Sequence, residues 1–120
     1  MAIFAVGSMV KTAEEVRNTL TEQGINPTVI NGRFMKPIDE DAVLKACSTH
    51  KLIVSLEENV AAGGYGEAIA TFMKREKLTN DLYMVAIPDR FIEHGSIDQL
   101  KQEIEMDTPA IVKGILERIR

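Results

Sequence analysis

The chain has 120 residues, and its 14 lysine and arginine residues against 18 aspartate and glutamate residues give a formal net charge of −4. Hydrophobic residues make up 45% and charged residues 27%, which is typical of a folded domain, and the acidic balance argues against nucleic-acid binding. No apolar run reaches the about 20 residues of a membrane-spanning helix. One cysteine excludes an internal disulfide, and one cysteine with two histidines cannot complete a closed zinc site. We therefore expect a single cytoplasmic domain over residues 1–120 that binds neither nucleic acid nor membrane.

The first half of the chain alternates strand-type and helix-type patterns. Residues 3–6 form a continuous apolar run closed by Gly7, which predicts a strand that is buried on both faces. Apolar residues then recur at helical spacing over 9–20, and Gly24 lies where a helix would end. A second strand is expected at 28–30, followed by a loop and by a helix that Asp39 caps.

The second half repeats this alternation. Residues 52–56 give the clearest strand, and a glycine-rich turn then leads into a helix with inward residues at 69, 72 and 73. A fourth strand is expected at 82–87, where Pro88 stops it. Two further helices are predicted, one after the Ser96–Gln99 capping box and one after Asp107.

Alternating strands and helices predict right-handed βαβ units, and therefore a three-layer α/β/α sandwich around a mainly parallel sheet. Such sheets meet their ligands or partners beyond the carboxyl ends of the strands. The loops at that edge are residues 7–8, 31–36, 57–66 and 88–95. Candidate functional residues should lie in these loops.

Gly63, Gly64 and Gly66 open a helix directly after a strand. Glycines in that place let backbone amides approach an anion, which the positive end of the helix dipole favours. The spacing matches neither a dinucleotide fingerprint nor a phosphate-binding loop. A tight turn with close packing between helix and sheet is the preferred interpretation.

Glu57 and Glu58 end the clearest strand. Neighbouring residues of a strand point to opposite faces, so they do not form a paired carboxylate site. One of them can cap the following helix or bind loop amides, while the other is solvated. Glu58 is retained as a candidate anion or interface residue together with the three glycines.

The loop after the fourth strand contributes Asp89 and His94 to the same set of candidates. Histidine is the usual general acid or base near neutral pH, although an isolated loop histidine more often bonds the backbone. Cys47 and His50 could form a nucleophile–base pair, but a buried cysteine and a histidine at a helix end are the commoner outcome. No set of these residues closes into a catalytic constellation.

Several motifs in chain order resemble the C-terminal domain of the transketolase superfamily, and within it the last domain of the 1-deoxy-D-xylulose-5-phosphate synthases. The resemblance covers essentially the whole chain. The motifs are VGSMV at 6–10, VINGRFMKPID at 29–39, IVSLEEN at 53–59, GGYG at 63–66 and IPDRFIEHG at 87–95.

The resemblance implies a fragment of a three-domain enzyme that uses thiamine diphosphate and Mg²⁺ to condense pyruvate with glyceraldehyde 3-phosphate, for isoprenoid and thiamine synthesis. The cofactor and substrate sites of that family lie mainly in its first two domains, so no catalytic, cofactor-binding or metal residue maps onto this chain. The implied role is structural and dimer-supporting, with a regulatory site as a further candidate. The implied partners are the other domains of the parent and a second copy of it.

The same resemblance implies the strand order 2-1-3-4. The family's antiparallel edge strand would precede the VGSMV motif and is expected to be missing here, which leaves one sheet edge exposed. Two alternatives stay open. One is the C-terminal assembly domain of a transketolase or of a 2-oxo acid dehydrogenase beta subunit, against which the FIEHG segment weighs. The other is a free-standing, anion-binding regulatory domain that uses the helix start at 63–66.

Overall fold

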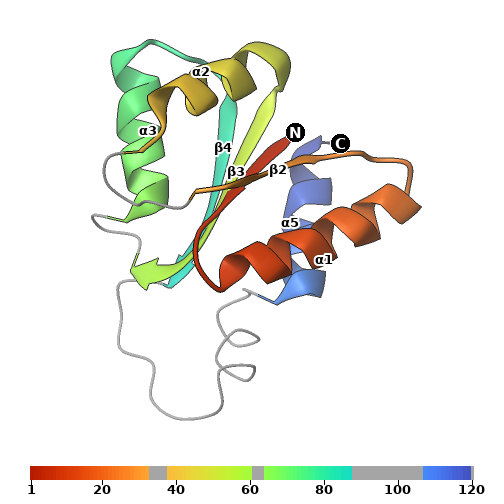
Figure 1. Ribbon diagram of the computed structural model, residues 1–120. Helices are drawn as coiled ribbons and strands as arrows, with labels where there is room; N and C mark the ends of the chain where they lie inside the picture. The colour runs from red at the N-terminus through yellow and green to blue at the C-terminus, as the bar shows by residue number, and fades with distance from the viewer. Residues whose placement is uncertain (33–37, 61–63, 88–106, 120) are drawn as a thin grey trace.

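The computed structural model describes residues 1–32, 38–60, 64–87 and 107–119. Within them, strands and helices alternate as the sequence predicts (Figure 1). The elements are β1 (Ala2–Ala5), α1 (Met9–Glu22), β2 (Thr28–Asn31), α2 (Glu40–Thr49), β3 (Leu52–Val60), α3 (Tyr65–Arg75), β4 (Asp81–Ile87) and α5 (Thr108–Ile119). The predicted helix after Ser96 lies outside the described residues.

The sheet has the order β2-β1-β3-β4, and all of its strand pairs are parallel. Both the parallel sheet and the predicted order 2-1-3-4 are therefore confirmed. In the register, Ala2 lies between Thr28 of β2 and Ile53 of β3. The pairing of β3 with β4 shifts between Leu56 and Val60, so the carboxyl end of β3 is irregular.

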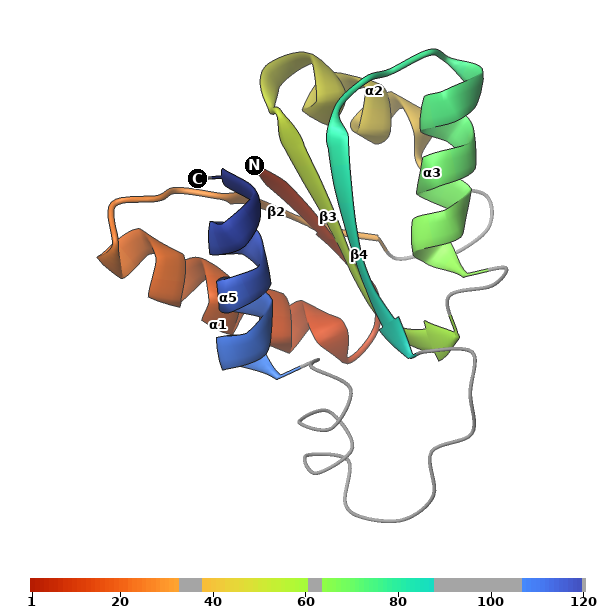
Figure 2. The ribbon, with the colours of Figure 1, turned by 180° about the vertical axis from the view of Figure 1, so that it is seen from behind.

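Helices cover both faces of the sheet, which confirms the three-layer architecture. Helices α1 and α5 lie on one face and α2 and α3 on the other (Figures 1 and 2). Side chains of β1 alternate between the two cores: Ile3 and Ala5 pack with α1 and α5, whereas Ala2 and Phe4 pack with α2 and α3. This double burial explains why the first strand is apolar at every position.

The helix starts follow local chemistry. The Asp39 carboxylate accepts a hydrogen bond from the Ala42 amide at 3.0 Å and caps α2, as predicted. Asp107 does the same for α5 through the Ala110 amide at 3.1 Å. Ser8 precedes α1 without a capping hydrogen bond from its side chain. No helix in the described parts of the chain is long and apolar enough to cross a membrane.

Candidate functional site at the carboxyl end of the sheet

A buried carboxylate, that of Glu57, joins β3 to the start of α3. Its side chain is 1% exposed. Oε1 accepts a hydrogen bond from the Tyr65 amide at 2.9 Å, and Oε2 accepts one from the Gly66 amide at 2.6 Å. Since the N-cap residue Gly64 has no side chain to do this, Glu57 supplies the cap from the neighbouring strand. Of the two glutamates considered from the sequence, Glu57 is therefore the one that caps the helix.

This contact changes what the start of α3 can bind. A helix N-terminus attracts anions through its unpaired amides and its positive dipole end. Here the carboxylate of Glu57 occupies both the Tyr65 and the Gly66 amides. The two amides that could bind an external anion at the glycine-rich turn are therefore already bonded to a carboxylate of the same chain.

Gly66 permits close packing of α3 on the sheet, as the sequence interpretation preferred. A Cβ atom at this position would lie 2.5 Å from Oγ of Ser55 and 3.2 Å from Cγ of Met84. Ser55 is fully buried, and its Oγ has no hydrogen-bond partner within the part of the chain that the structure describes. The helix start therefore sits directly on the hydroxyl of Ser55.

Tyr65 links this helix start to the end of β2. Its side chain is 2% exposed, and its ring lies 6.5 Å from that of Phe4 between centroids. The hydroxyl approaches Gly32 so closely that a Cβ atom there would collide with it. Burial, followed by the charges of Asp39 and Glu57, raises the pKa of Tyr65 to about 12. The sequence alone does not single out Tyr65; its place within the GGYG motif at 63–66 was the available signal.

The predicted candidates are only partly brought together. Gly64 and Gly66 lie at the start of α3, and Glu58 is half-buried in β3, next to Glu57 in the sequence. Gly63, Asp89 and His94 lie outside the described residues. The structure thus assembles a capping cluster of Glu57, Tyr65 and Gly66, and it leaves the proposed loop partners undescribed.

The described residues do not fit thiamine diphosphate with its metal ion. They contain no group of three or more His, Cys, Asp or Glu side chains placed to hold a metal. The amides of Tyr65 and Gly66, the best-placed donors for a phosphate group, already bond Glu57. No catalytic step through that cofactor follows from these residues.

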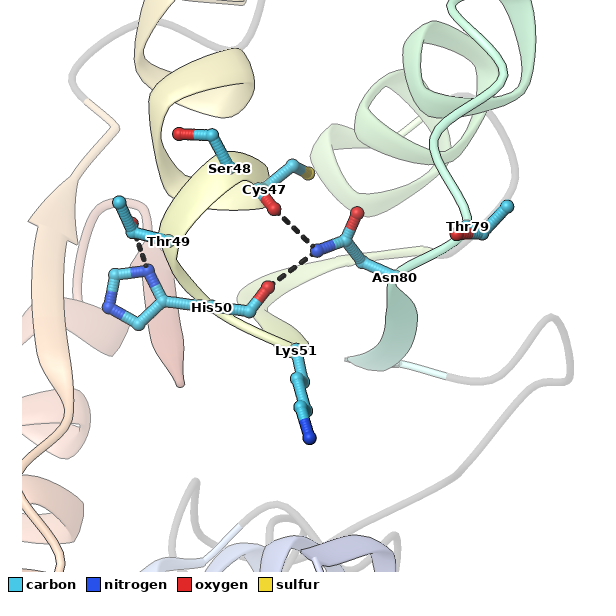
Figure 3. A pocket seen from close by; sticks show the side chains of 7 residues that line it. All are labelled: Cys47, Ser48, Thr49, His50, Lys51, Thr79 and Asn80. Carbon is cyan, nitrogen blue, oxygen red and sulfur yellow. Dashed lines mark hydrogen bonds between the residues drawn. The ribbon is translucent and has the colours of Figure 1, made fainter.

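The opposite, amino end of β3 has a polar cavity of about 620 Å³ (Figure 3). Nδ2 of Asn80 donates to the carbonyl oxygens of Cys47 at 2.8 Å and of His50 at 2.5 Å. The His50 ring lies against the hydroxyl of Thr49 at 2.8 Å and the carbonyl of Ala46 at 3.0 Å. The cavity is lined by residues 47–51, 79 and 80. These contacts tie the end of α2 to the start of β4, which is a structural joint.

Cys47 and His50 do not form a nucleophile–base pair. The ring nitrogens of His50 face Thr49, Ala46 and, at 3.3 Å, the hydroxyl of Thr28. Burial raises the pKa of the Cys47 thiol, which disfavours the reactive thiolate. The commoner interpretation, a partly buried cysteine and a histidine at a helix end, agrees with these contacts.

The parallel sheet of order 2-1-3-4 between two helical layers agrees with a transketolase-type C-terminal domain. The family model described as "Transketolase, C-terminal domain" matches residues 1–111. The chain belongs to this family.

Similar curated proteins carry the name 1-deoxy-D-xylulose-5-phosphate synthase. The one from Caldanaerobacter subterraneus subsp. tengcongensis is 38% identical over 120 residues, covering 100% of this chain and 19% of the relative. The one from Dehalococcoides mccartyi is 38% identical over 121 residues, covering 99% of this chain and 19% of the relative. The chain therefore spans about a fifth of the length of these relatives.

Solved structures agree on the fold. "Split gene transketolase, inactive beta4 tetramer" superimposes with a TM-score of 0.85 at 25% identity, covering 97% of this chain and 37% of that one. Transketolase from Campylobacter jejuni gives a TM-score of 0.60 at 18% identity, covering 97% of this chain and 16% of that one. The second likeness concerns the fold alone.

Proposed function

We propose that this chain is the C-terminal domain of a thiamine-diphosphate-dependent 1-deoxy-D-xylulose-5-phosphate synthase. Relatives of that name match it along its whole length at 38% identity. In this proposal residues 1–120 are one part of a three-domain cytoplasmic transferase that joins pyruvate to glyceraldehyde 3-phosphate. Its product would serve isoprenoid and thiamine synthesis. Thiamine diphosphate and Mg²⁺ would be bound by the preceding domains.

Within that enzyme we assign the chain a structural role that includes support of a homodimer. The observation that carries the structural part of this role is the Glu57 cap: both oxygens of a carboxylate that is 1% exposed bond the amides of Tyr65 and Gly66. A group that acts on substrate must be reachable, whereas this one is sealed between β3 and α3. The Glu57 carboxylate therefore stabilises the attachment of α3 to β3.

A domain exchange tests the proposal. The chain replaces the last domain of the Caldanaerobacter synthase, and formation of 1-deoxy-D-xylulose 5-phosphate is measured with thiamine diphosphate and Mg²⁺ present. We expect the chimera to be active, and the synthase truncated before that domain to be impaired. A chimera that folds but makes no product would contradict the assignment.

The isolated chain provides the complementary test. Incubated with the same cofactors and substrates, it should give no turnover. Measurable product from these 120 residues would overturn the structural role. The chimera assay would then still report on membership of the parent enzyme, so the two parts of the proposal are tested separately.

A further inference from the structure

The dipeptide formed by Asn31 and Gly32 lies at the carboxyl end of β2. Asn31 is the last residue of this strand, and its side chain is exposed. Its side-chain amide has no hydrogen bond to another described residue, so it is free to turn toward the backbone that follows. An asparagine followed by glycine is chemically labile, because glycine has no side chain to hinder attack of its backbone nitrogen on the asparagine amide.

The packing of Tyr65 accounts for the glycine in this dipeptide. Among the described residues, the glycines with positive φ are Gly7 and Gly24, so Gly32 is not needed for a left-handed backbone. It is needed for space, because a Cβ atom at Gly32 would collide with the Tyr65 hydroxyl. Tyr65 is 2% exposed and packs beside Phe4, which leaves it little room to move aside. The buried tyrosine thus requires the residue that makes Asn31 labile.

The strand pairing of β2 with β1 opposes this lability. Asn31 pairs with Ala5 in the parallel register, and the Gly32 N–H donates to the Ala5 carbonyl at 2.8 Å. The Gly32 nitrogen must lose its proton and turn toward the Asn31 side chain before it can attack. This hydrogen bond must therefore open first, and strand ends open locally at a lower free energy than the whole fold.

We propose that Asn31 is a site of spontaneous deamidation, and that opening of the hydrogen bond between Gly32 and Ala5 controls its rate. The deprotonated Gly32 nitrogen attacks Cγ of Asn31, so that an N–Cγ bond forms, the C–NH₂ bond breaks, and the amine takes up a proton and leaves as ammonia. A water molecule from the solvent then opens the succinimide ring at either carbonyl. The products are aspartate and isoaspartate.

Both products alter the carboxyl end of the sheet. Aspartate adds a negative charge to a chain whose net charge is already −4. Isoaspartate also routes the backbone through the side chain, which lengthens it between β2 and Gly32 and displaces the Gly32 N–H from the Ala5 carbonyl. The modification therefore loosens the place where Tyr65 packs on Gly32. It goes beyond the proposed function and does not depend on it.

Peptide mapping by mass spectrometry tests the proposal on the chain itself. The chain is incubated at mildly alkaline pH, once in buffer and once unfolded in guanidinium chloride. We expect Asn31 to convert in both, and at least about fivefold faster in the unfolded chain, because the hydrogen bond to Ala5 no longer restrains Gly32. No conversion in buffer, or equal rates in the two solutions, would overturn the proposal.

The same tryptic peptide contains matched controls. Cleavage after Arg17 and Arg33 leaves Asn18, Asn26 and Asn31 in one peptide, so fragment ions compare them within the same molecules. Asn26 precedes a proline, whose nitrogen carries no hydrogen, and Asn18 lies in α1 before a threonine. Both should stay largely unmodified while Asn31 converts. If Asn18 converts as fast as Asn31, the glycine does not direct the reaction and the proposal is wrong.

Two valine variants separate local opening from global unfolding. Val29 in β2 and Val10 in α1 are both half-buried and pack against the same core. Val29→Gly weakens the strand beside the site and should raise conversion of Asn31 in buffer about threefold, with no change in guanidinium chloride. Val10→Gly weakens α1 instead and should leave the rate unchanged. Equal acceleration by both variants, or none by Val29→Gly, would contradict control by the end of β2.

Discussion

At each end of β3, a side chain bonds the unpaired backbone groups at the end of a neighbouring helix, but an acceptor does so at one end and a donor at the other. At the carboxyl end the Glu57 carboxylate accepts from the amides that begin α3, and at the amino end the Asn80 amide donates to carbonyls at the end of α2. Each group matches the polarity of its helix end. They differ in burial, because Glu57 is 1% exposed whereas Asn80 is partly exposed. Disruption should therefore cost more at the carboxyl end, where water cannot replace the lost partner.

The largest effect is expected for Glu57→Gln. The side-chain amide has nearly the same shape, but its NH₂ group must face a backbone N–H, so one donor loses its partner and the other loses a charged acceptor. We expect a loss of about 2–4 kcal/mol in the free energy of unfolding. Urea denaturation followed by circular dichroism measures it.

The matched control is Glu67→Gln in the first turn of the same helix, where the side chain is exposed. Only its interaction with the helix dipole is lost, about 0.3–1 kcal/mol. If both substitutions lower the free energy of unfolding by the same amount, the burial of Glu57 does not account for the strength of its cap.

Alkaline pH should lower the free energy of unfolding because it ionises Tyr65, which lies at the carboxyl end of the sheet. The pKa of Tyr65 is raised to about 12 in the folded chain, against about 10 in the unfolded chain. The protonated hydroxyl therefore stabilises the fold fully below about pH 10, and this contribution, on the order of 3 kcal/mol, is lost as the pH rises through about 12. Denaturation at increasing pH should show a steeper loss for the unmodified chain than for Tyr65→Phe.

Tyr83→Phe leaves Tyr65 as the single tyrosine that can ionise, because the chain has two tyrosines. The ultraviolet absorbance of phenolate in that variant then reports Tyr65 alone, with an expected midpoint near 12. A midpoint near the ordinary tyrosine value of about 10 would contradict the burial of its hydroxyl.

Gly66→Ala probes how closely α3 sits on the sheet. The added Cβ would lie 2.5 Å from Oγ of Ser55, so we expect a loss of about 1–3 kcal/mol. Ser55→Ala alone should be neutral or stabilising, since the hydroxyl is buried without a partner in the described chain. Combined with Gly66→Ala, it should recover part of the loss in a double-mutant cycle. Strictly additive effects would show that the two residues are not in contact.

Much of the fold could be predicted because its signals are local. The apolar run at 3–6 and the cap at Asp39 depend on neighbouring residues, and the order 2-1-3-4 came from the family resemblance. The length of β3 could not be predicted, because Glu57 and Glu58 resemble the beginning of a loop. The strand continues to Val60, and within it the Glu57 carboxylate is satisfied by amides eight and nine positions later in the sequence.

The candidate site likewise depends on contacts that are distant in the sequence and that the sequence therefore does not reveal. Glycine spacing identified the start of α3, but the position of Tyr65 depends on its approach to Gly32, which lies in another loop. In the sequence Met84 belongs to an apolar strand and resembles a core residue, whereas among the described residues it is 44% exposed on β4, the last strand of the sheet. Contacts between segments far apart in the sequence decide each of these features.

The smallest effect is expected at the amino end of β3. Asn80→Ala removes the donor to the Cys47 and His50 carbonyls, but these groups border an open polar cavity, so water can take the place of the amide. We expect a loss of about 1–2 kcal/mol in urea denaturation, and about zero for the control Thr79→Ala on the same cavity. Asn80→Asp should cost more at neutral than at acidic pH, because a carboxylate would face two carbonyl oxygens until it is protonated. A loss as large as that of Glu57→Gln would mean that helix polarity, rather than burial, sets the strength of both joints.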